Sequence, residues 1–210
     1  MAGNGLGTGA NKVLRGMYER AVTAAYLARF PDQAQRFLDY ANITTRKLFN
    51  HAKDLHGVAY VEAAVGSDFL KEIEEEYQKV RADFKDMHSW SKLNLLDMAK
   101  KAGYGLEHCY FYGHALPTQQ IHSTALSFAS RVNMQVHGTF LDDSDEKRMA
   151  AQAVMVAHVV MLKVLRLQNA YFALGFDEEI KQRETECKAA WPRAADFLDI
   201  AFGQDATALD

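Results

Sequence analysis

Long helical patterns with few interruptions are the feature of this sequence that most limits its fold. Apolar residues recur three or four positions apart over most of the chain, and the alternation typical of half-buried strands is almost absent. The interruptions stand at Pro31, Gly57, Gly103, Pro117 and Gly175, residues that begin or end helices. The pattern predicts an all-α fold, a single-domain helical bundle of about six to eight helices.

These interruptions also predict the helix boundaries. We expect helices over residues 11–29, 31–55 and 67–87, and a short helix that follows Trp90 and ends at Gly103. Further helices are expected from Pro117, from the acidic segment near residue 142 to about residue 174, and around Trp191. Residues 57–66 are expected to be a connector, with Ser67 as the cap of the next helix.

Length and composition fit one ordinary globular domain. The chain has 210 residues, of which 49% are hydrophobic and 24% charged, so we expect one domain at residues 11–203 between flexible segments 1–10 and 204–210. The net charge of −3 gives no global basic surface for nucleic acid, although it does not exclude a local patch.

The sequence indicates a cytoplasmic protein without a membrane partner. Cys109 and Cys187 have no metal-binding or redox spacing and are expected to be reduced thiols. The glycine-rich start lacks the apolar segment of a secretory signal. The apolar run from Ala150 is interrupted by polar residues such as Lys163, and it is expected to be a buried helix, too short and too polar to span a bilayer.

A polar stretch around His122 is the strongest candidate for a functional site. Gln119, Gln120, Ser123 and Thr124 surround this histidine, where a surface helix would carry Lys and Glu and a core helix Leu and Ala. Gln119 and His122 share a helix face, which could bind a ligand or fix the tautomer of a catalytic imidazole. A lone histidine in a helix is more often a satisfied, partly buried residue, so this alternative stays open.

Arg15 and Glu19 form a second candidate, since they lie one helical turn apart. The simpler interpretation is an exposed ion pair worth a few tenths of a kcal/mol. The functional interpretation makes Arg15 an anion or phosphate clamp, with Glu19 as its orienter or as a base. The histidines lack the spacing of helical metal ligands, and the sequence predicts no metal and no cofactor.

Four segments together resemble a large family of bacterial proteins known only as a domain of unknown function. They are RGMYERAVTAAYL with Arg15 and Glu19, FLDY ending at Tyr40, the segment HSWSKLNLLDMAKKAG around Trp90, and LPTQQIHST with His122. The resemblance covers roughly residues 11–135 and implies a helical fold. It also implies that Arg15, Glu19, Tyr40 and His122 meet in space, with Tyr40 among the ligand-binding residues.

A more distant resemblance links the chain to the HEPN superfamily of small helical proteins, many of them metal-independent ribonucleases of toxin and phage-defence systems. Those enzymes carry an arginine a few residues before a histidine. In some relatives an arginine precedes the histidine that corresponds to His122, whereas this chain has His114 and Ala115 at those positions. Arg46/His51, Arg81/His88 and Arg131/His137 also fit the arginine–histidine spacing, but roughly one such match is expected by chance, so these pairs carry little weight.

Two classes of function therefore stay open. The first is a HEPN-like protein of a bacterial defence or stress system that acts on RNA or a nucleotide, with Arg15, Glu19 and His122 as catalytic residues. The second is a non-enzymatic module that binds a small ligand or a protein partner in the same polar pocket, an interpretation favoured by the acidic composition and by the missing arginine. A homodimer would bury an apolar helix face in either case.

Overall fold

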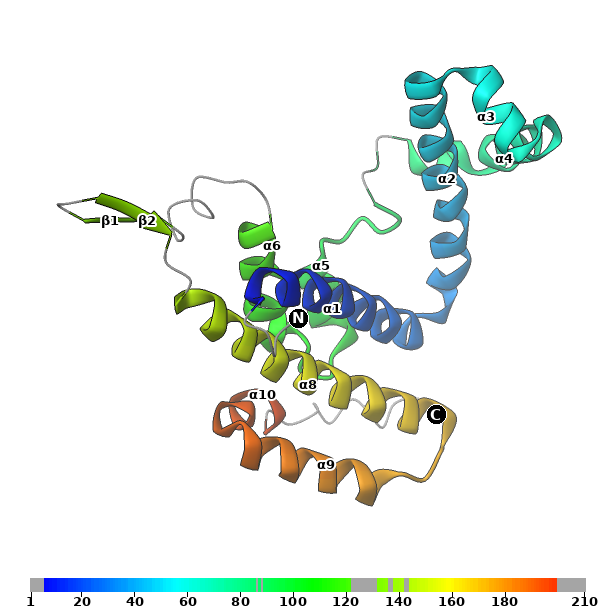
Figure 1. The fold of residues 1–210 in the computed structure, drawn as a ribbon. Coiled ribbons are helices and arrows are strands. Elements are labelled where there is room, and N and C mark those ends of the chain that lie inside the picture. The colour runs from blue at the N-terminus through cyan, green and yellow to red at the C-terminus, as the bar shows by residue number, and fades with distance from the viewer. Residues whose placement is uncertain are drawn as a thin grey trace. The chain divides into compact units, whose positions relative to one another are not determined.

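The protein is all-α, as the sequence predicts, apart from one short hairpin (Figure 1). The computed structural model describes residues 6–85, 87, 89–121, 132–135, 138–141 and 144–199, and it describes side chains at all of these except 120–121, 132–135, 138–141 and 144–146. The chain divides into two compact units, Met1–Arg29 with Leu95–Asp210, and Phe30–Asn94. The domain bounds expected from the sequence stay a prediction.

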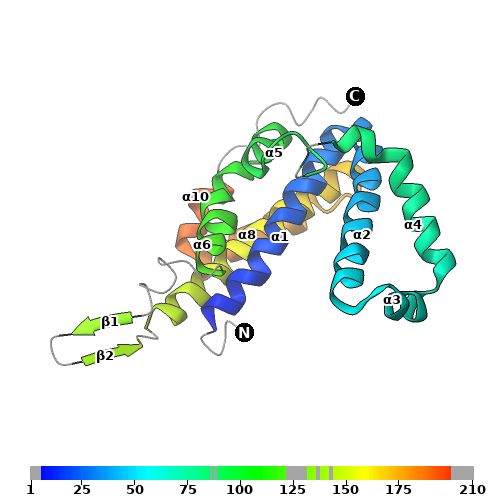
Figure 2. The same ribbon diagram turned by 90° about the horizontal axis from the view of Figure 1, so that it is seen from above.

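The first unit is built around α1 (Gly7–Arg29) and the long helix α8 (Ser144–Phe172), which lie side by side in both views (Figures 1 and 2). Helices α5 (Leu95–Ala102) and α6 (Leu116–Ile121) also pack on α1, while α9 (Asp177–Ala190) packs on α8. The short helix α10 (Ala195–Leu198) follows a 3₁₀ turn at Pro192–Ala194.

Buried residues along α1 recur three and four positions apart, which gives this helix a single apolar stripe. The stripe begins near Leu14 and reaches Tyr26 through Tyr18 and Val22. On α8, Val156, Val159 and Val160 are almost completely buried. The small side chains in the α1 stripe, Ala21 and Ala25, leave room for the close approach of a second helix.

Helix α8 lies within the range that the sequence predicts, about residues 142–174, and contains the apolar run from Ala150. By length and composition alone, Lys147–Phe172 could cross a membrane, which corrects the expectation that this run is too short. Half of the apolar stretch is buried inside the structure, and Lys163 within it is buried and donates a 3.0 Å hydrogen bond to the backbone oxygen of Tyr104. These are the features of a core helix, in agreement with the expectation of a buried one.

The two cysteines of the first unit are buried free thiols. Burial raises the pKa of the Cys109 thiol to about 11, so this group stays protonated at neutral pH and is a poor nucleophile. Cys109 is therefore a packed core residue, as its aromatic neighbourhood in the sequence indicates.

A β-hairpin occupies part of the segment that follows α6. Strands β1 (Val132–Gln135) and β2 (Gly138–Leu141) pair antiparallel, with Val132 opposite Leu141 and Gln135 opposite Gly138. The sequence analysis did not predict these strands, because each is only four residues long and the alternation is too short to stand out.

The second unit consists of α2 (Ala34–His56), α3 (Val58–Val65) and α4 (Ser67–Val80), which pack on one another. A 3₁₀ turn at Pro31–Gln33 precedes α2, and another at Arg81–Phe84 follows α4. Helix α3 lies at the end of α2, and α4 runs back beside α2 (Figure 2).

The expected connector at residues 57–66 is in fact helix α3, and its flanking glycines explain why. Gly57 and Gly66 adopt φ values of 86° and 89°, and each backbone N–H donates to the carbonyl of a residue four positions earlier. The chain therefore turns twice and still leaves eight residues for a helix, which buries Val61. The expected cap was also wrong, because Ser67 is the first residue of α4 and makes no capping hydrogen bond.

Candidate functional site

Arg15 and Glu19 form an ion pair on α1. The Arg15 Nε donates a 2.8 Å hydrogen bond to Oε1 of Glu19, and the two side chains are 29% and 39% exposed. An ion pair between residues one helical turn apart is what the simpler interpretation of the sequence expects. Both side chains are only partly exposed, because a third group packs beside them.

The third group is His114, which lies far away in the sequence. Its Nδ1 is 3.3 Å from the same Oε1 of Glu19, and the side chain is 18% exposed. This nitrogen is shielded from solvent, and the carboxylate approaches it without the alignment of a hydrogen bond within the described residues. Arg15, Glu19 and His114 together are called the Arg15–Glu19–His114 cluster below.

A π-helical turn at Phe111–Ala115 places His114 beside α1. This turn runs directly into α6, and Thr118 of α6 donates a 2.6 Å hydrogen bond to the His114 backbone oxygen. Such wide turns are rare and are frequent at functional sites. Pro117 lies in the first turn of α6, the position that the sequence analysis assigned to it.

Two tyrosine rings pack beside the imidazole of His114. The Tyr110 ring lies 5.3 Å from the His114 ring, and the Tyr18 ring lies 6.5 Å from it. The fully buried Tyr18 donates a 2.9 Å hydrogen bond to the backbone oxygen of Leu106, which holds its own ring in place. The imidazole is thus fixed on a rigid part of the core.

Burial lowers the pKa of His114 below its ordinary value. The nearby Glu19 carboxylate opposes this shift, and the Arg15 guanidinium adds to it. The imidazole is therefore neutral at neutral pH, the form that can accept a proton. Attraction to Glu19 favours the tautomer with hydrogen on Nδ1, which leaves Nε2 as the basic nitrogen.

The cluster combines three chemical abilities. His114 supplies a base, Glu19 orients that base and stabilises its protonated form, and Arg15 can hold an anion. Within the described residues, the recorded bond of Arg15 uses Nε alone, which leaves both terminal amino groups of the guanidinium for a ligand. Among the residues that the structure describes, no group of three or more His, Cys, Asp or Glu side chains could hold a metal ion.

The other residues of the polar stretch are only partly described. Gln119 is exposed near the end of α6, and nothing is described of the Gln120 side chain. His122, Ser123 and Thr124 lie outside the described residues, so their catalytic and binding roles stay predictions.

Tyr40 packs within the unit of residues 30–94. Its ring lies 5.3 Å from that of Phe84, and its backbone oxygen accepts a hydrogen bond from Thr44. Arg46, from one of the arginine–histidine pairs, bonds Glu74 rather than a histidine. The ligand-binding role expected for Tyr40 stays a prediction.

His114 is the member of the cluster that the sequence analysis missed as a catalytic candidate. It stands in an aromatic segment and was weighed only as a metal ligand or as the replacement for an arginine. The signal that could have identified it is Gly113, since the absence of a side chain there allows the π-helical turn to approach Tyr18 of α1.

We predict that Gly113→Ala disrupts the cluster. A Cβ at this position would lie 2.9 Å from Cδ2 and 3.0 Å from Cγ of Tyr18, so the turn that carries His114 would have to shift. The expected loss of stability is roughly 1–3 kcal/mol, as for other overpacked sites. Urea unfolding measures it.

Gly16→Ala is the matched control for this prediction. A Cβ at Gly16, which lies on α1 next to Arg15, would meet nothing within 4 Å, so this change should leave stability unchanged or raise it by about 0.5–1 kcal/mol. Equal effects of the two substitutions would contradict the packing argument.

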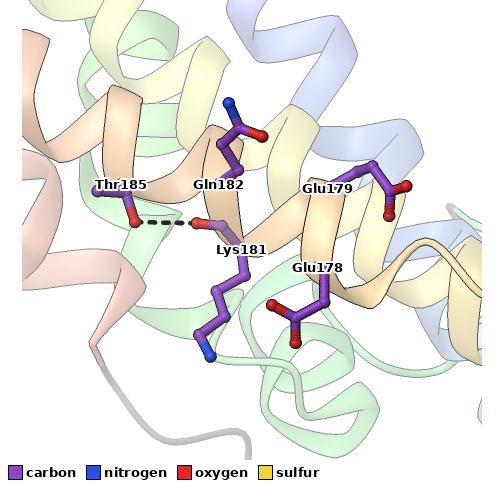
Figure 3. Close-up of a pocket in the computed structure, with 5 residues that line it drawn as sticks. All are labelled: Glu178, Glu179, Lys181, Gln182 and Thr185. Atoms are coloured by element: carbon purple, nitrogen blue, oxygen red, sulfur yellow. Dashed lines mark hydrogen bonds between the residues drawn. The ribbon is translucent and has the colours of Figure 1, made fainter.

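A hollow on the surface of α9 does not qualify as a functional site. It has a volume of about 440 Å³ and is lined by Glu178, Glu179, Lys181, Gln182 and Thr185 (Figure 3). All five are exposed residues of one helix, and the bond drawn there is an ordinary one within the helix, from the Thr185 hydroxyl to the Lys181 backbone oxygen.

Comparison with known proteins gives one finding. A search of curated proteins and of solved structures gives no significant match. The model of a family of unknown function, DUF5677, matches residues 1–140, which include α1, the turn that carries His114, and α6. Since the match covers two thirds of the chain, the protein belongs to the DUF5677 family.

Proposed function

We propose that the protein is a HEPN-like helical protein that binds RNA at the Arg15–Glu19–His114 cluster and cleaves it without a metal. The observation that carries this proposal is the contact between His114 and Glu19, which also holds Arg15. The cluster provides the phosphate-binding arginine and the basic histidine that metal-independent RNA cleavage requires, although the two lie on different helices rather than in one short motif.

The proposed reaction is attack of a ribose 2′-hydroxyl on the adjacent phosphorus. Nε2 of His114 takes the hydroxyl proton while Arg15 stabilises the negative charge on the phosphate oxygens. The bond from phosphorus to the 5′-oxygen breaks, giving a 2′,3′-cyclic phosphate and a free 5′-hydroxyl. The leaving oxygen takes up a proton, and we assign this acid to His122, which the sequence analysis names as a catalytic residue without fixing it as acid or base.

Glu19 has a positioning role in this scheme. Its carboxylate lies between two groups that are positive at the moment of reaction, the Arg15 guanidinium and the imidazolium formed on His114. It therefore stabilises the protonated base without contacting the substrate.

The same geometry supports the non-enzymatic alternative. Glu19 neutralises Arg15 directly, at 2.8 Å, which weakens the attraction of the cluster for a phosphate. In this alternative the cluster binds a small ligand or a protein partner by hydrogen bonds and performs no chemistry.

Incubation of the wild-type protein with a mixed RNA pool in EDTA separates the two functions. Cleavage that survives EDTA and ends in cyclic phosphates is expected, and Arg15→Ala should reduce it by about 10²–10³-fold, as for other groups that stabilise transition-state charge. Arg20→Ala is the matched control, because Arg20 is an exposed arginine on the same helix.

Three results would contradict the enzyme. These are no cleavage by wild type at high protein concentration, cleavage abolished by EDTA, and equal losses in the two arginine variants. The first would favour the non-enzymatic module.

A further inference from the structure

A basic groove lies in the second unit, among residues of α2, α4 and the turn that follows α4. Its cavity volume is about 690 Å³, within the ordinary range for small-ligand sites. Arg46, Lys47, Arg81 and Lys85 line it together with Tyr77 and Phe84, and these six residues define the basic groove below.

Helical spacing gathers the four cations. Arg46 and Lys47 are neighbours on α2. Tyr77 lies on α4 one helical turn before Arg81, and Lys85 directly follows the 3₁₀ turn that Arg81 begins. All three residues line the basic groove.

Charge balance within the basic groove favours an anion as its ligand. None of the described lining residues is acidic, although the whole chain carries a net charge of −3. Glu74 does not line the groove, but its Oε2 lies 3.2 Å from Nε of Arg46. The pKa of the Glu74 carboxyl is lowered by the hydrogen bond from Gln78 and, to a smaller extent, by Arg46. Within the described residues, Lys47, Arg81 and Lys85 are in no ion pair, so three cations are left for a ligand.

The arrangement of Arg46 favours phosphate over other anions. Its guanidinium lies 4.3 Å from the centre of the Tyr77 ring, and with Glu74 on Nε it is held from two sides. A fixed planar guanidinium with lysines around it is suited to the several oxygens of a phosphate group.

We propose that the basic groove binds a phosphate-bearing anion, either a free nucleotide or a stretch of single-stranded RNA. The basic groove belongs to the unit of residues 30–94 and shares no residue with the Arg15–Glu19–His114 cluster, so the proposal goes beyond the proposed function and does not depend on RNA cleavage.

Binding is best measured with His114→Ala as the background, so that cleavage does not consume the probe. The probes are pyrophosphate, ADP, a fluorescent single-stranded RNA of about ten nucleotides and a glutamate-rich peptide. The test variant is Arg81→Glu/Lys85→Glu, whose side chains belong to exposed residues. The control, Lys100→Glu/Lys101→Glu, changes the net charge equally at two exposed positions of α5, outside the basic groove.

The test variant should lose at least about tenfold in RNA or ADP affinity, and its salt dependence should weaken by about 0.7 in the logarithmic slope for each RNA phosphate that it no longer neutralises. The control should keep its affinity within about twofold, since Lys100 and Lys101 do not line the basic groove and exposed charges are strongly screened at physiological salt. Binding of ADP and pyrophosphate would identify a nucleotide site, and binding of RNA alone would identify a strand site.

Three outcomes would overturn the proposal. One is equal loss in the test variant and the control. Another is that the protein with an unaltered groove binds neither pyrophosphate nor ADP nor RNA at ligand concentrations up to about 1 mM. The third is binding of the glutamate-rich peptide in preference to every phosphate probe. Melting curves of both variants show whether the fold is kept.

Discussion

His114→Ala is expected to lower the rate of RNA cleavage by about 10²–10⁴-fold, the usual contribution of a positioned general base. The substitution removes the imidazole that lies 3.3 Å from Glu19 and leaves the Arg15–Glu19 ion pair in place. Phosphate binding should therefore persist while the chemical step is lost. Single-turnover cleavage measures the rate, and binding of a substrate blocked at its 2′-hydroxyl measures the affinity.

The pH dependence of this activity distinguishes a catalytic His114 from a structural one. A base must be deprotonated, so activity should fall as the pH drops through the pKa of His114 in the folded protein. Burial lowers this pKa, which puts the acid limb of the profile below the ordinary value of 6.5. Glu19→Gln should move the limb to still lower pH, because the carboxylate raises the pKa, and Arg15→Ala should move it upward, because the guanidinium lowers it.

His158→Ala is the control, since this histidine lies on α8 and takes no part in the cluster. It should leave both the rate and the profile unchanged. A full rate in His114→Ala, or an acid limb that neither charge substitution moves, would contradict the assignment of His114 as the base. An imidazole titration by NMR gives the same two shifts even in the absence of any cleavage.

The helices follow from local sequence signals, and so most of the fold could be predicted. The end of α1 before Pro31, the end of α2 at Gly57 and the end of α5 at Gly103 all depend on backbone preferences of single residues. Helix α3 could not be separated from a connector, because a run of eight residues between two glycines has no clear period.

The candidate site was only half predictable, for a physical reason. Arg15 and Glu19 are neighbours on one helix, so their spacing reveals the pair. His114 joins them only because Gly113 and the π-helical turn bring a distant segment against Tyr18, and no local pattern encodes that approach. The basic groove was missed for the same reason, since its cations come from two separate helical segments.

Trp90→Ala is expected to cost about 3–5 kcal/mol of unfolding free energy, the range for removal of a core aromatic side chain. Trp90 is a core residue, since only 7% of it is exposed. Its ring meets that of Phe37 edge to face, with centroids 5.3 Å apart. Such an arrangement adds about 0.5–1.5 kcal/mol to the stabilisation from the area that both rings bury.

The backbone of Trp90 also takes part in hydrogen bonding, so the packing of its side chain affects more of the unit than that one residue. Its carbonyl oxygen accepts a 2.9 Å hydrogen bond from Nε of Arg36, and the same guanidinium donates to the backbone oxygen of Asp83 and lies 4.6 Å from the Phe84 ring. Arg36 thus links α2 to both ends of the segment between α4 and Trp90. The apolar packing of the indole holds this segment in the position in which Arg36 can bond to it. Loss of the indole removes that packing.

Urea unfolding followed by circular dichroism measures the effect, with the slope of the transition as a check that the same surface is exposed in each variant. Tyr60→Ala is the control, because this aromatic residue of the same unit is 65% exposed and should change stability by less than about 0.5 kcal/mol. Trp90→Phe keeps part of the edge-to-face packing and should fall between the two. A loss below about 1 kcal/mol in Trp90→Ala would contradict the anchoring role, since a buried indole packed in this way cannot be removed at so small a cost.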